Sequence, residues 1–246
     1  RGIALEICRF DENATVFDYV RDLEKRRLRR IFCAMPPGAE LVRALRGSGC
    51  EIVVLSGNDP APPEVFAVRF PYGMTQLGCR YLLRCGRRRI GLVDYQPPGQ
   101  SGKIRQNTAE YYRFMAERNL KIEPHWLIRY PPQEALFEGL GRMFAVAPIP
   151  DGLIVPTTWL PEVYRFLVRH SRLVGRDVAV VGLGTPVELR PRPAIVVNSP
   201  DELAEVGWRL MAKLLAGGSP EQVVLPLRLL PGGMAGGAPE HEPPEQ

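Results

Sequence analysis

Short aliphatic runs alternate along the chain with longer segments in which apolar residues recur at three- and four-residue spacing. The short runs predict buried strands, and the longer segments predict amphipathic helices. We expect strands at residues 3–8, 31–35, 52–55, 90–93, 127–130, 152–155 and 178–181. We expect helices at residues 14–26, 41–47, 74–85, 109–118, 133–144, 160–170 and 201–216. Strands and helices that alternate in this way predict parallel sheets covered by helices on both faces.

The last predicted helix has clear start and stop signals. Ser199 stands where an N-cap belongs, Pro200 follows at the first helical position, and two acids occupy the first turn. Two glycines at 217 and 218 then end the helix. A further apolar segment at residues 223–230 predicts the last strand, and residues 235–246, rich in proline and acids, predict a disordered tail.

The chain length of 246 residues suits one large domain or two lobes of about 120 residues each. Seven strands in two runs of alternating units favour two doubly wound lobes. We expect three crossovers, near residues 94–98, 196–199 and 219–225. The N-terminal lobe would then hold residues 1–95 and 199–219, and the C-terminal lobe residues 96–198 and 220–234. No apolar run approaches the roughly 20 residues of a membrane helix, so no membrane partner is expected.

Basic residues outnumber acidic ones by 32 to 27, a net charge of +5, and all but four of the 32 are arginine. Two dense runs, at residues 25–30 and 87–89, each fall where a helix ends and a strand begins. The negative end of the helix dipole stabilises cations at that place. The runs therefore indicate solvated helix ends more than a phosphate-binding patch, although both interpretations stay open.

The five cysteines are an odd number without a C-x-x-C pair, and most lie inside apolar segments. This pattern favours reduced, buried thiols in the cytosol over disulfides or zinc ligands. The three histidines are far apart in the sequence, which leaves few ligands for a metal ion. We expect no metal site and no cofactor.

Several segments occur in an order that carries a family resemblance. They read GxxYLLxxGRRRIGLV at residues 78–93, PDGLIV at 150–155, VxxDVAVVG at 174–182, and WxxMxxLLxG at 208–217 followed by VLP at 224–226. Together they resemble the effector-binding domains of LacI/GalR-type transcription regulators, which are similar to periplasmic sugar-binding proteins. The resemblance covers about residues 1–233, and each segment alone is only a helix-to-strand junction.

The resemblance implies a type I periplasmic-binding-protein-like fold in a cytoplasmic bacterial regulator. Residues 2–35 match the family's second strand, second helix and third strand, so we expect its first strand and helix to be absent from these residues. The implied partners are a small-molecule effector, operator DNA through a helix-turn-helix domain outside this chain, and a second copy in a homodimer. The predicted helices 41–47 and 74–85, with Leu77, Tyr81 and Leu82 on one stripe, are candidate dimer contacts.

The resemblance also implies that a sugar-like effector binds in the cleft between the lobes. Ligands of open α/β sheets bind outside the carboxyl ends of the strands. The candidate ligand-binding residues follow predicted strands or open helices: Arg105, Trp159, Thr157, Asp11, Tyr72, Tyr95 and Asn198. Simpler roles remain open, because Trp159, Tyr72 and Tyr95 are also typical packing residues, and Asp11 is a typical N-cap or turn residue.

Several polar anchors of the family are replaced here. Its usual Arg is matched by Asn107, with Arg105 two residues away, and its Asn-Asp pair by Thr157 and Thr158. An Asp that is usual in the family is replaced here by Gly184 or Thr185. A second usual Asp, near the start of the helix at 74–85, is replaced by Tyr72 or Gly73. The pocket chemistry is thus expected to differ from that of typical sugar-binding members.

Enzyme motifs are absent or incomplete. Residues 182–184 lack the third glycine of a dinucleotide-binding loop, residues 99–103 lack P-loop spacing, and no G-x-S-x-G occurs. We expect no catalytic residues. The alternative function is an extracytoplasmic solute-binding protein of a transporter, but the free cysteines and the missing signal-peptide layout favour the regulator.

Replacing Arg105 by Ala should weaken effector binding, because a charge-assisted hydrogen bond contributes about 1.5 to 3 kcal/mol. That corresponds to a roughly tenfold to hundredfold loss of affinity, measurable by calorimetry with any sugar or sugar phosphate that binds. Unchanged affinity in Arg105→Ala would remove this residue from the site.

Overall fold

The computed structural model describes residues 15–34, 38–55, 61–94, 106–129 and 133–233, together with Glu6 and Cys8. These residues divide into two compact units, each with its own sheet. The first unit is drawn from Arg1–Pro71 and Ser199–Pro226, and the second from Tyr72–Asn198 and Leu227–Gln246. The predicted class, two doubly wound α/β units, is confirmed. No helix in the described ranges has the length and apolarity needed to cross a bilayer.

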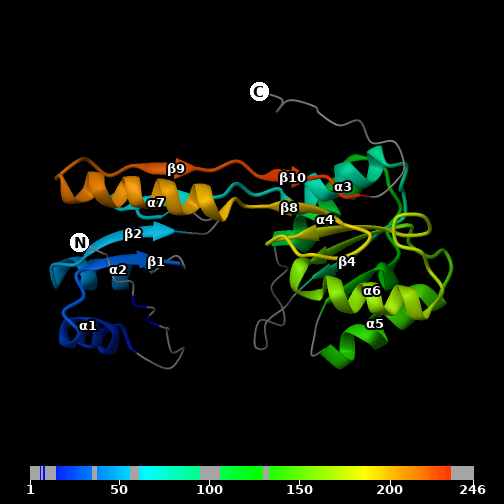
Figure 1. Ribbon diagram of the computed structural model, residues 1–246, viewed down its shortest axis with the longest axis horizontal. Coiled ribbons are helices and arrows are strands. Elements are labelled where there is room, and N and C mark those ends of the chain that lie inside the picture. The colour runs from blue at the N-terminus through cyan, green and yellow to red at the C-terminus, as the bar shows by residue number, and fades with distance from the viewer. Residues whose placement is uncertain are drawn as a thin grey trace. The chain divides into compact units, whose positions relative to one another are not determined.

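The first unit is built on a four-stranded parallel sheet in the order β1-β2-β3-β9. Side chains of β2 alternate between its faces: Ile52 and Val54 pack with α1 and α2, whereas Val53 packs beneath α7. Figure 1 shows α7 running alongside β9. The elements are α1 Val16–Lys25, β1 Arg30–Cys33, α2 Ala39–Gly47, β2 Glu51–Leu55, β3 Phe66–Arg69, α7 Pro200–Leu215 and β9 Gln222–Val224.

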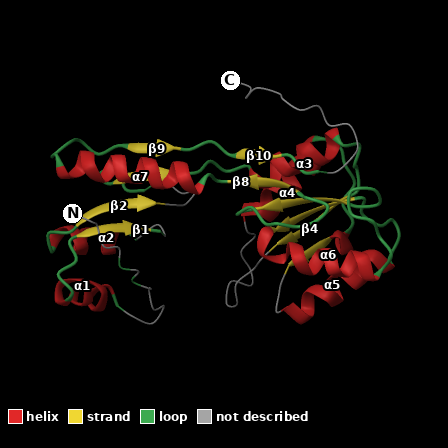
Figure 2. Cartoon of the chain, in the orientation of Figure 1, coloured by secondary structure: helices red, strands yellow, loops and turns green. Residues whose placement is uncertain are grey.

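The second unit is built on a six-stranded sheet in the order β10-β8-β7-β6-β4-β5, parallel except for β10. Helices α3 and α4 contribute the core on one face, and α5 and α6 the core on the other (Figure 2). The helices are α3 Met74–Arg84, α4 Gln106–Glu117, α5 Gln133–Ala145 and α6 Leu160–Arg169, with short turns η1 Pro124–Trp126 and η2 Thr157–Trp159. The strands are β4 Ile90–Asp94, β5 Leu127–Arg129, β6 Gly152–Pro156, β7 Ala179–Leu183, β8 Ala194–Val197 and β10 Arg228–Leu230.

All seven predicted helices are confirmed, with ends within three residues of the prediction. Ser199 caps α7 as expected, since its hydroxyl accepts from the Glu202 amide at 3.3 Å. Six of the seven predicted strands are also confirmed. The seventh, at residues 3–8, and the predicted tail at 235–246 lie outside the described residues, apart from Glu6 and Cys8. Strands β3 and β8 were not predicted, although prolines precede and follow both of these four-residue segments.

The predicted boundary at residue 95 is wrong. Strand β4 pairs with β5 and β6, and α3 packs on β6, β7 and β8, so both belong to the second unit. The first crossover therefore lies at residues 71–72, and the other two lie at 198–199 and 226–227. Helix α7 belongs to the first unit, as predicted. The predicted last strand at residues 223–230 is wrong in part, because it forms two strands: β9 pairs with β3 in the first unit, and only β10 belongs to the second. Residues 220–226 therefore belong to the first unit, contrary to the predicted boundary.

The predicted dimer stripe on α3 is also wrong. Tyr81 and Leu82 are buried in the core of the second unit, and Leu77 packs against the same cluster. Leu82 also lies within about 3 Å of where a side chain on Gly152 would begin. These residues cover the sheet of their own chain and are not available to a second copy.

Six helices end in the same way, with a left-handed residue directly after the C-cap. Its amide and the next one bond back to carbonyls in the last turn, which satisfies groups that the helix leaves open. Glycine fills this position after α2, α3 and α7, but the other three helices use Arg27, Asn119 and Ser171. Only glycine adopts this conformation without a steric penalty.

Gly86→Ala should destabilise the protein by about 1 to 2 kcal/mol, because a side chain at its positive φ of 77° is strained although no atom lies within 4 Å of the new Cβ. Ser171→Gly, at the equivalent position of α6, should stabilise it by about 0.5 to 1 kcal/mol. Urea denaturation measures both, with Asn119→Gly as a control that changes less because Asn tolerates this region. Equal stabilities for Gly86→Ala and the parent would contradict the conformational argument.

Candidate functional site

The polar groups of the second unit gather at the carboxyl edge of its parallel sheet. Strands β4, β6, β7 and β8 run in the same direction, so residues that follow them share one edge. Pro156 at the end of β6 pairs with Leu183 at the end of β7, and Thr157 and Gly184 come next. Residues that are distant in the sequence are therefore neighbours here.

Thr157 and Gly184 fit closely together. A Cβ on Gly184 would lie 2.8 Å from the Thr157 hydroxyl, and Gly184 has a positive φ of 125°. The Gly184 amide donates to the Val196 carbonyl at 2.9 Å, which holds this turn against β8. The buried Thr157 thus leaves no space for a side chain at Gly184. Gly184 is one of the two positions at which the family resemblance leads one to expect an Asp.

Asn198 and Thr75 each carry a buried oxygen without a hydrogen-bond partner. These atoms are Asn198 Oδ1, directly after β8, and Thr75 Oγ1, in the first turn of α3. Buried polar atoms are normally paired, so each such atom calls for an explanation. A bound hydroxyl or an ordered water would supply the missing partner.

A buried acid ends β4. Asp94 is 3% exposed, and its carboxylate accepts a 2.6 Å hydrogen bond from the Thr108 hydroxyl. The side-chain amide of Asn107 adds a weaker hydrogen bond, with 3.4 Å between its Nδ2 and Asp94 Oδ1. The first turn of α4 is therefore fastened to the end of the strand that precedes it.

A second buried acid, Glu110, lies in α4 and is also 3% exposed. Its carboxylate accepts from the backbone amides of Gly73 at 2.8 Å and Thr75 at 3.2 Å, at the N-terminus of α3. The Gln106 side chain donates to the same group at 3.1 Å. The N-cap residue of α3 is Gly73, which has no side chain of its own, so Glu110 caps this helix from the neighbouring one.

The structure brings only part of the predicted site together. Thr157, Trp159 and Asn198 lie at or next to the carboxyl edge of the second unit. Trp159 is half-buried and packs against the core beneath α6, which supports a packing role for part of its ring. Tyr72 precedes α3 and is about half exposed. Arg105, Asp11 and Tyr95 lie outside the described residues.

Sequence reasoning missed Asp94, Thr75 and Glu110. The signal for Glu110 is an acid within the buried stripe of a helix, since Thr108, Tyr111 and Phe114 around it are all buried. An ionised side chain at such a position needs several donors. The partners of Glu110 lie 35 to 37 residues earlier in the chain, so no local pattern reveals them.

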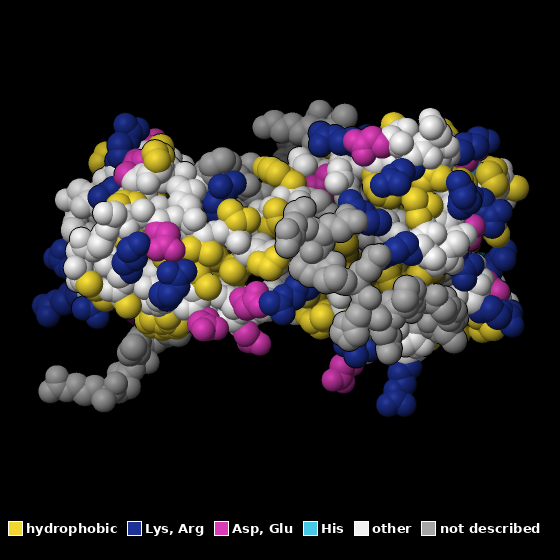
Figure 3. All heavy atoms as spheres, turned by 90° about the horizontal axis from the view of Figure 1, so that it is seen from above, with side chains coloured by type: hydrophobic (Ala, Val, Ile, Leu, Met, Phe, Trp, Pro, Cys, Tyr) yellow, Lys and Arg dark blue, Asp and Glu magenta, His cyan; other side chains and the backbone are white. Residues whose placement is uncertain are grey.

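The two arginine runs mainly serve internal contacts. Arg26 pairs with two acids, and Arg29 donates to the Ser48 carbonyl. Arg87 donates to two backbone carbonyls at 2.9 and 3.0 Å, and Arg89 pairs with Asp151. Figure 3 shows basic side chains dispersed over the visible face rather than gathered in one patch. These contacts support the helix-end interpretation.

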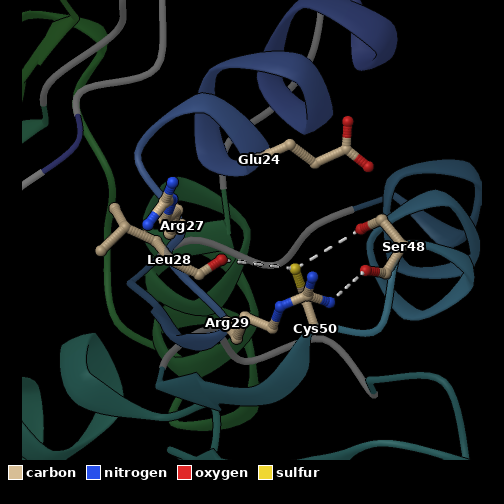
Figure 4. Close-up of a pocket in the computed structure, with 6 residues that line it drawn as sticks. All are labelled: Glu24, Arg27, Leu28, Arg29, Ser48 and Cys50. Carbon is tan, nitrogen blue, oxygen red and sulfur yellow. Dashed lines mark hydrogen bonds between the residues drawn. The ribbon is translucent and has the colours of Figure 1, made fainter.

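A cavity of about 200 Å³ lies in the first unit, at the amino ends of β1 and β2. Its lining residues are Glu24, Arg27, Leu28, Arg29, Ser48 and Cys50 (Figure 4). The cavity is at the sheet edge opposite the strand carboxyl ends. Helices α1 and α2 both end beside it, and their negative dipole ends oppose an anion. The Arg29 guanidinium already bonds the Ser48 carbonyl at 3.1 Å, so the cavity is a weak candidate for ligand binding.

Burial changes the chemistry of two thiols among the described residues. Burial raises the pKa of the Cys33 thiol to about 11, and the nearby Cys50 thiol adds to this effect. Burial also raises the pKa of Cys79, with the Glu110 carboxylate acting in the same direction. Both side chains are protonated at neutral pH and are poor nucleophiles. Among the described residues, no group of three or more His, Cys, Asp or Glu side chains is placed to hold a metal ion.

Comparison with known proteins establishes the fold. No family model matches the chain, and no curated protein matches it. Among solved structures, a LacI family transcriptional regulator from an Arthrobacter species, in complex with lactose, has a TM-score of 0.73 at 20% identity, covering 91% of this chain and 84% of that chain. A LacI-family regulatory protein from Chloroflexus aggregans has a TM-score of 0.71 at 18% identity, covering 93% and 85%.

A third similar structure is a LacI family transcriptional regulator from Enterococcus faecium with bound ribose. Its TM-score is 0.70 at 16% identity, and the match covers 91% of this chain and 85% of that chain. Each match covers most of both chains, so this chain has the fold of LacI-family regulator domains of the periplasmic-binding-protein-like type.

Thr108→Val should destabilise the second unit by about 1.5 to 3 kcal/mol, because it removes a hydrogen bond to the buried Asp94 carboxylate without changing the side-chain volume. Thr108→Ser keeps the hydroxyl and should lose less. Urea denaturation followed by circular dichroism measures both. The argument is wrong if the valine variant is as stable as the parent while the serine variant is not.

Proposed function

We propose that this chain is the ligand-sensing part of a LacI-type transcription regulator. It binds a sugar-like small molecule at the carboxyl edge of the second unit. The bound state then controls operator binding by a helix-turn-helix domain that is not among these 246 residues. The regulators with bound ribose and lactose that share the fold support this proposal.

The observation that carries the proposal is the set of neutral polar groups at this edge. Asn198 has a buried acceptor without a partner, and the buried Thr157 follows β6, two strands along the same edge. The two acids there, Asp94 and Glu110, are already engaged by groups of the protein. Neutral hydrogen-bonding groups suit a ligand rich in hydroxyls, because each hydroxyl can both donate and accept a hydrogen bond.

Aromatic side chains beside this edge complete the proposed site. Trp159 keeps part of its ring accessible, and Tyr72 is about half exposed. Apolar faces of sugar rings pack against such rings. Arg105, Asp11 and Tyr95 remain proposed members on the sequence argument alone.

The cysteines favour a regulator over a solute-binding protein of a transporter. All five are free, and Cys33, Cys50 and Cys79 are buried. Reduced thiols are typical of the cytosol, whereas exported proteins usually oxidise theirs. We therefore propose a cytoplasmic, non-enzymatic role, with homodimerisation matching the two-fold symmetry of an operator.

Calorimetry against ribose, lactose, cellobiose and the corresponding sugar phosphates tests this function. At least one neutral sugar should bind, and Asn198→Ala should weaken that binding about fivefold to tenfold, the effect of losing one hydrogen bond of about 1 to 1.5 kcal/mol. Lys121→Ala is the control. It is exposed and precedes β5, at the opposite edge of the same sheet. Binding of no sugar, or equal affinity in Asn198→Ala and the parent, would argue against this site.

A further inference from the structure

Glu110 joins two helix starts within the second unit. Its Oε1 accepts from the Gly73 amide and from the Gln106 side chain, and its Oε2 accepts from the Thr75 amide. The Gly73 and Thr75 amides belong to the start of α3, and the Gln106 side chain belongs to the start of α4. One buried carboxylate thus holds three donors from two elements that are far apart in the sequence.

The α3 side of this junction is the segment through which the chain enters the second unit. The unit begins at Tyr72, and Gly73 follows with a left-handed φ of 117°. A Cβ on Gly73 would meet nothing within 4 Å, so the conformation is set by the backbone path and not by crowding. The Gly73 amide is fixed by a side chain of α4, since no side chain of α3 caps it.

The α4 side of the junction adjoins the proposed effector site. Gln106 is the first residue of α4 and directly follows Arg105. Asn107 and Thr108 bond the Asp94 carboxylate in the same turn. A ligand that contacts this turn acts on residues whose hydrogen bonds lead through Glu110 to Gly73.

We propose that Glu110 is a positioning residue that couples the first turn of α4 to the conformation of the chain at Gly73. The coupling rests on the proposed function only in assigning the first turn of α4 to the effector site. The carboxylate is the shared element: loss of the Gln106 contact lets it shift, and its hold on the two α3 amides then weakens. A crossover segment tied in this way transmits a local change at the edge of the sheet to the point where the chain enters the unit.

Residue-resolved amide hydrogen exchange by NMR tests the coupling without any ligand. In Glu110→Gln, exchange at Gly73 and Thr75 should accelerate about tenfold or more, because hydrogen bonds to a charged acceptor are lost. In Gln106→Ala, which removes no contact to either amide, the same two amides should exchange roughly twofold to fivefold faster than in the parent, a fraction of that effect. Gln106→Lys retains a donor to the carboxylate and should restore the slow exchange.

Glu117→Gln is the matched control, since Glu117 is an exposed acid at the other end of α4. It should leave exchange at Gly73 and Thr75 unchanged. Faster exchange in Glu110→Gln together with unchanged exchange in Gln106→Ala would overturn the coupling and leave Glu110 as a local cap. Unchanged exchange in both would overturn the role of the carboxylate altogether.

Gln106 is exposed, so its variants should fold even if Glu110→Gln does not. The exchange rates in Gln106→Ala and Gln106→Lys then test the coupling without the Glu110 variant. A failure of every sugar to bind would count against the proposed function and leave these exchange rates unaffected. The two proposals therefore fail on different measurements.

Discussion

Parallel pairing of β4, β6, β7 and β8 is the constraint on which the second unit depends. The connections from β4 to β6 and from β6 to β7 carry helices, whereas residues 184–193 join β7 to β8 without one. Together with α3, these helices fill both faces with apolar side chains. The strands then deliver their carboxyl ends to one edge, where Asp94, Thr157, Gly184 and Asn198 follow one another across the sheet. Polar groups concentrate there because the faces have no room for them.

Buried charge at this edge explains how two helices start. The acids at 94 and 110 are taken from water, so each needs donors supplied by the fold. The donor to Asp94 is Thr108 in the following helix, α4, and a donor to Glu110 is the Gly73 amide at the start of the preceding helix, α3. The protein thus uses two carboxylates to fix α3 and α4 relative to the sheet, a task that capping residues perform locally in helices such as α1 and α7.

The helices and most strands were predictable because their signals are local. Apolar spacing, Ser199 as a cap and the glycines after α2, α3 and α7 all act within a few residues. The assignment of α3 to a unit depends on which sheet its buried side chains contact, and that is set by pairing between β4 and β6, about 60 residues apart. The partners of Glu110 were hidden for the same reason. A simple rule about strand ends placed Thr157 and Asn198 at the carboxyl edge of the sheet, where they lie in the structure.

The three tryptophans are distributed unevenly between the units, and this has a spectroscopic consequence. Trp126 is fully buried in the second unit, and its indole donates to the Pro148 carbonyl at 2.7 Å. Trp208 belongs to the first unit, where it meets the edge of Phe32 and remains 41% exposed. Acrylamide therefore quenches the emission of Trp208 more than that of Trp126, while the half-buried Trp159 of the second unit gives an intermediate signal. The emission that acrylamide does not reach reports on the second unit through Trp126, without a label.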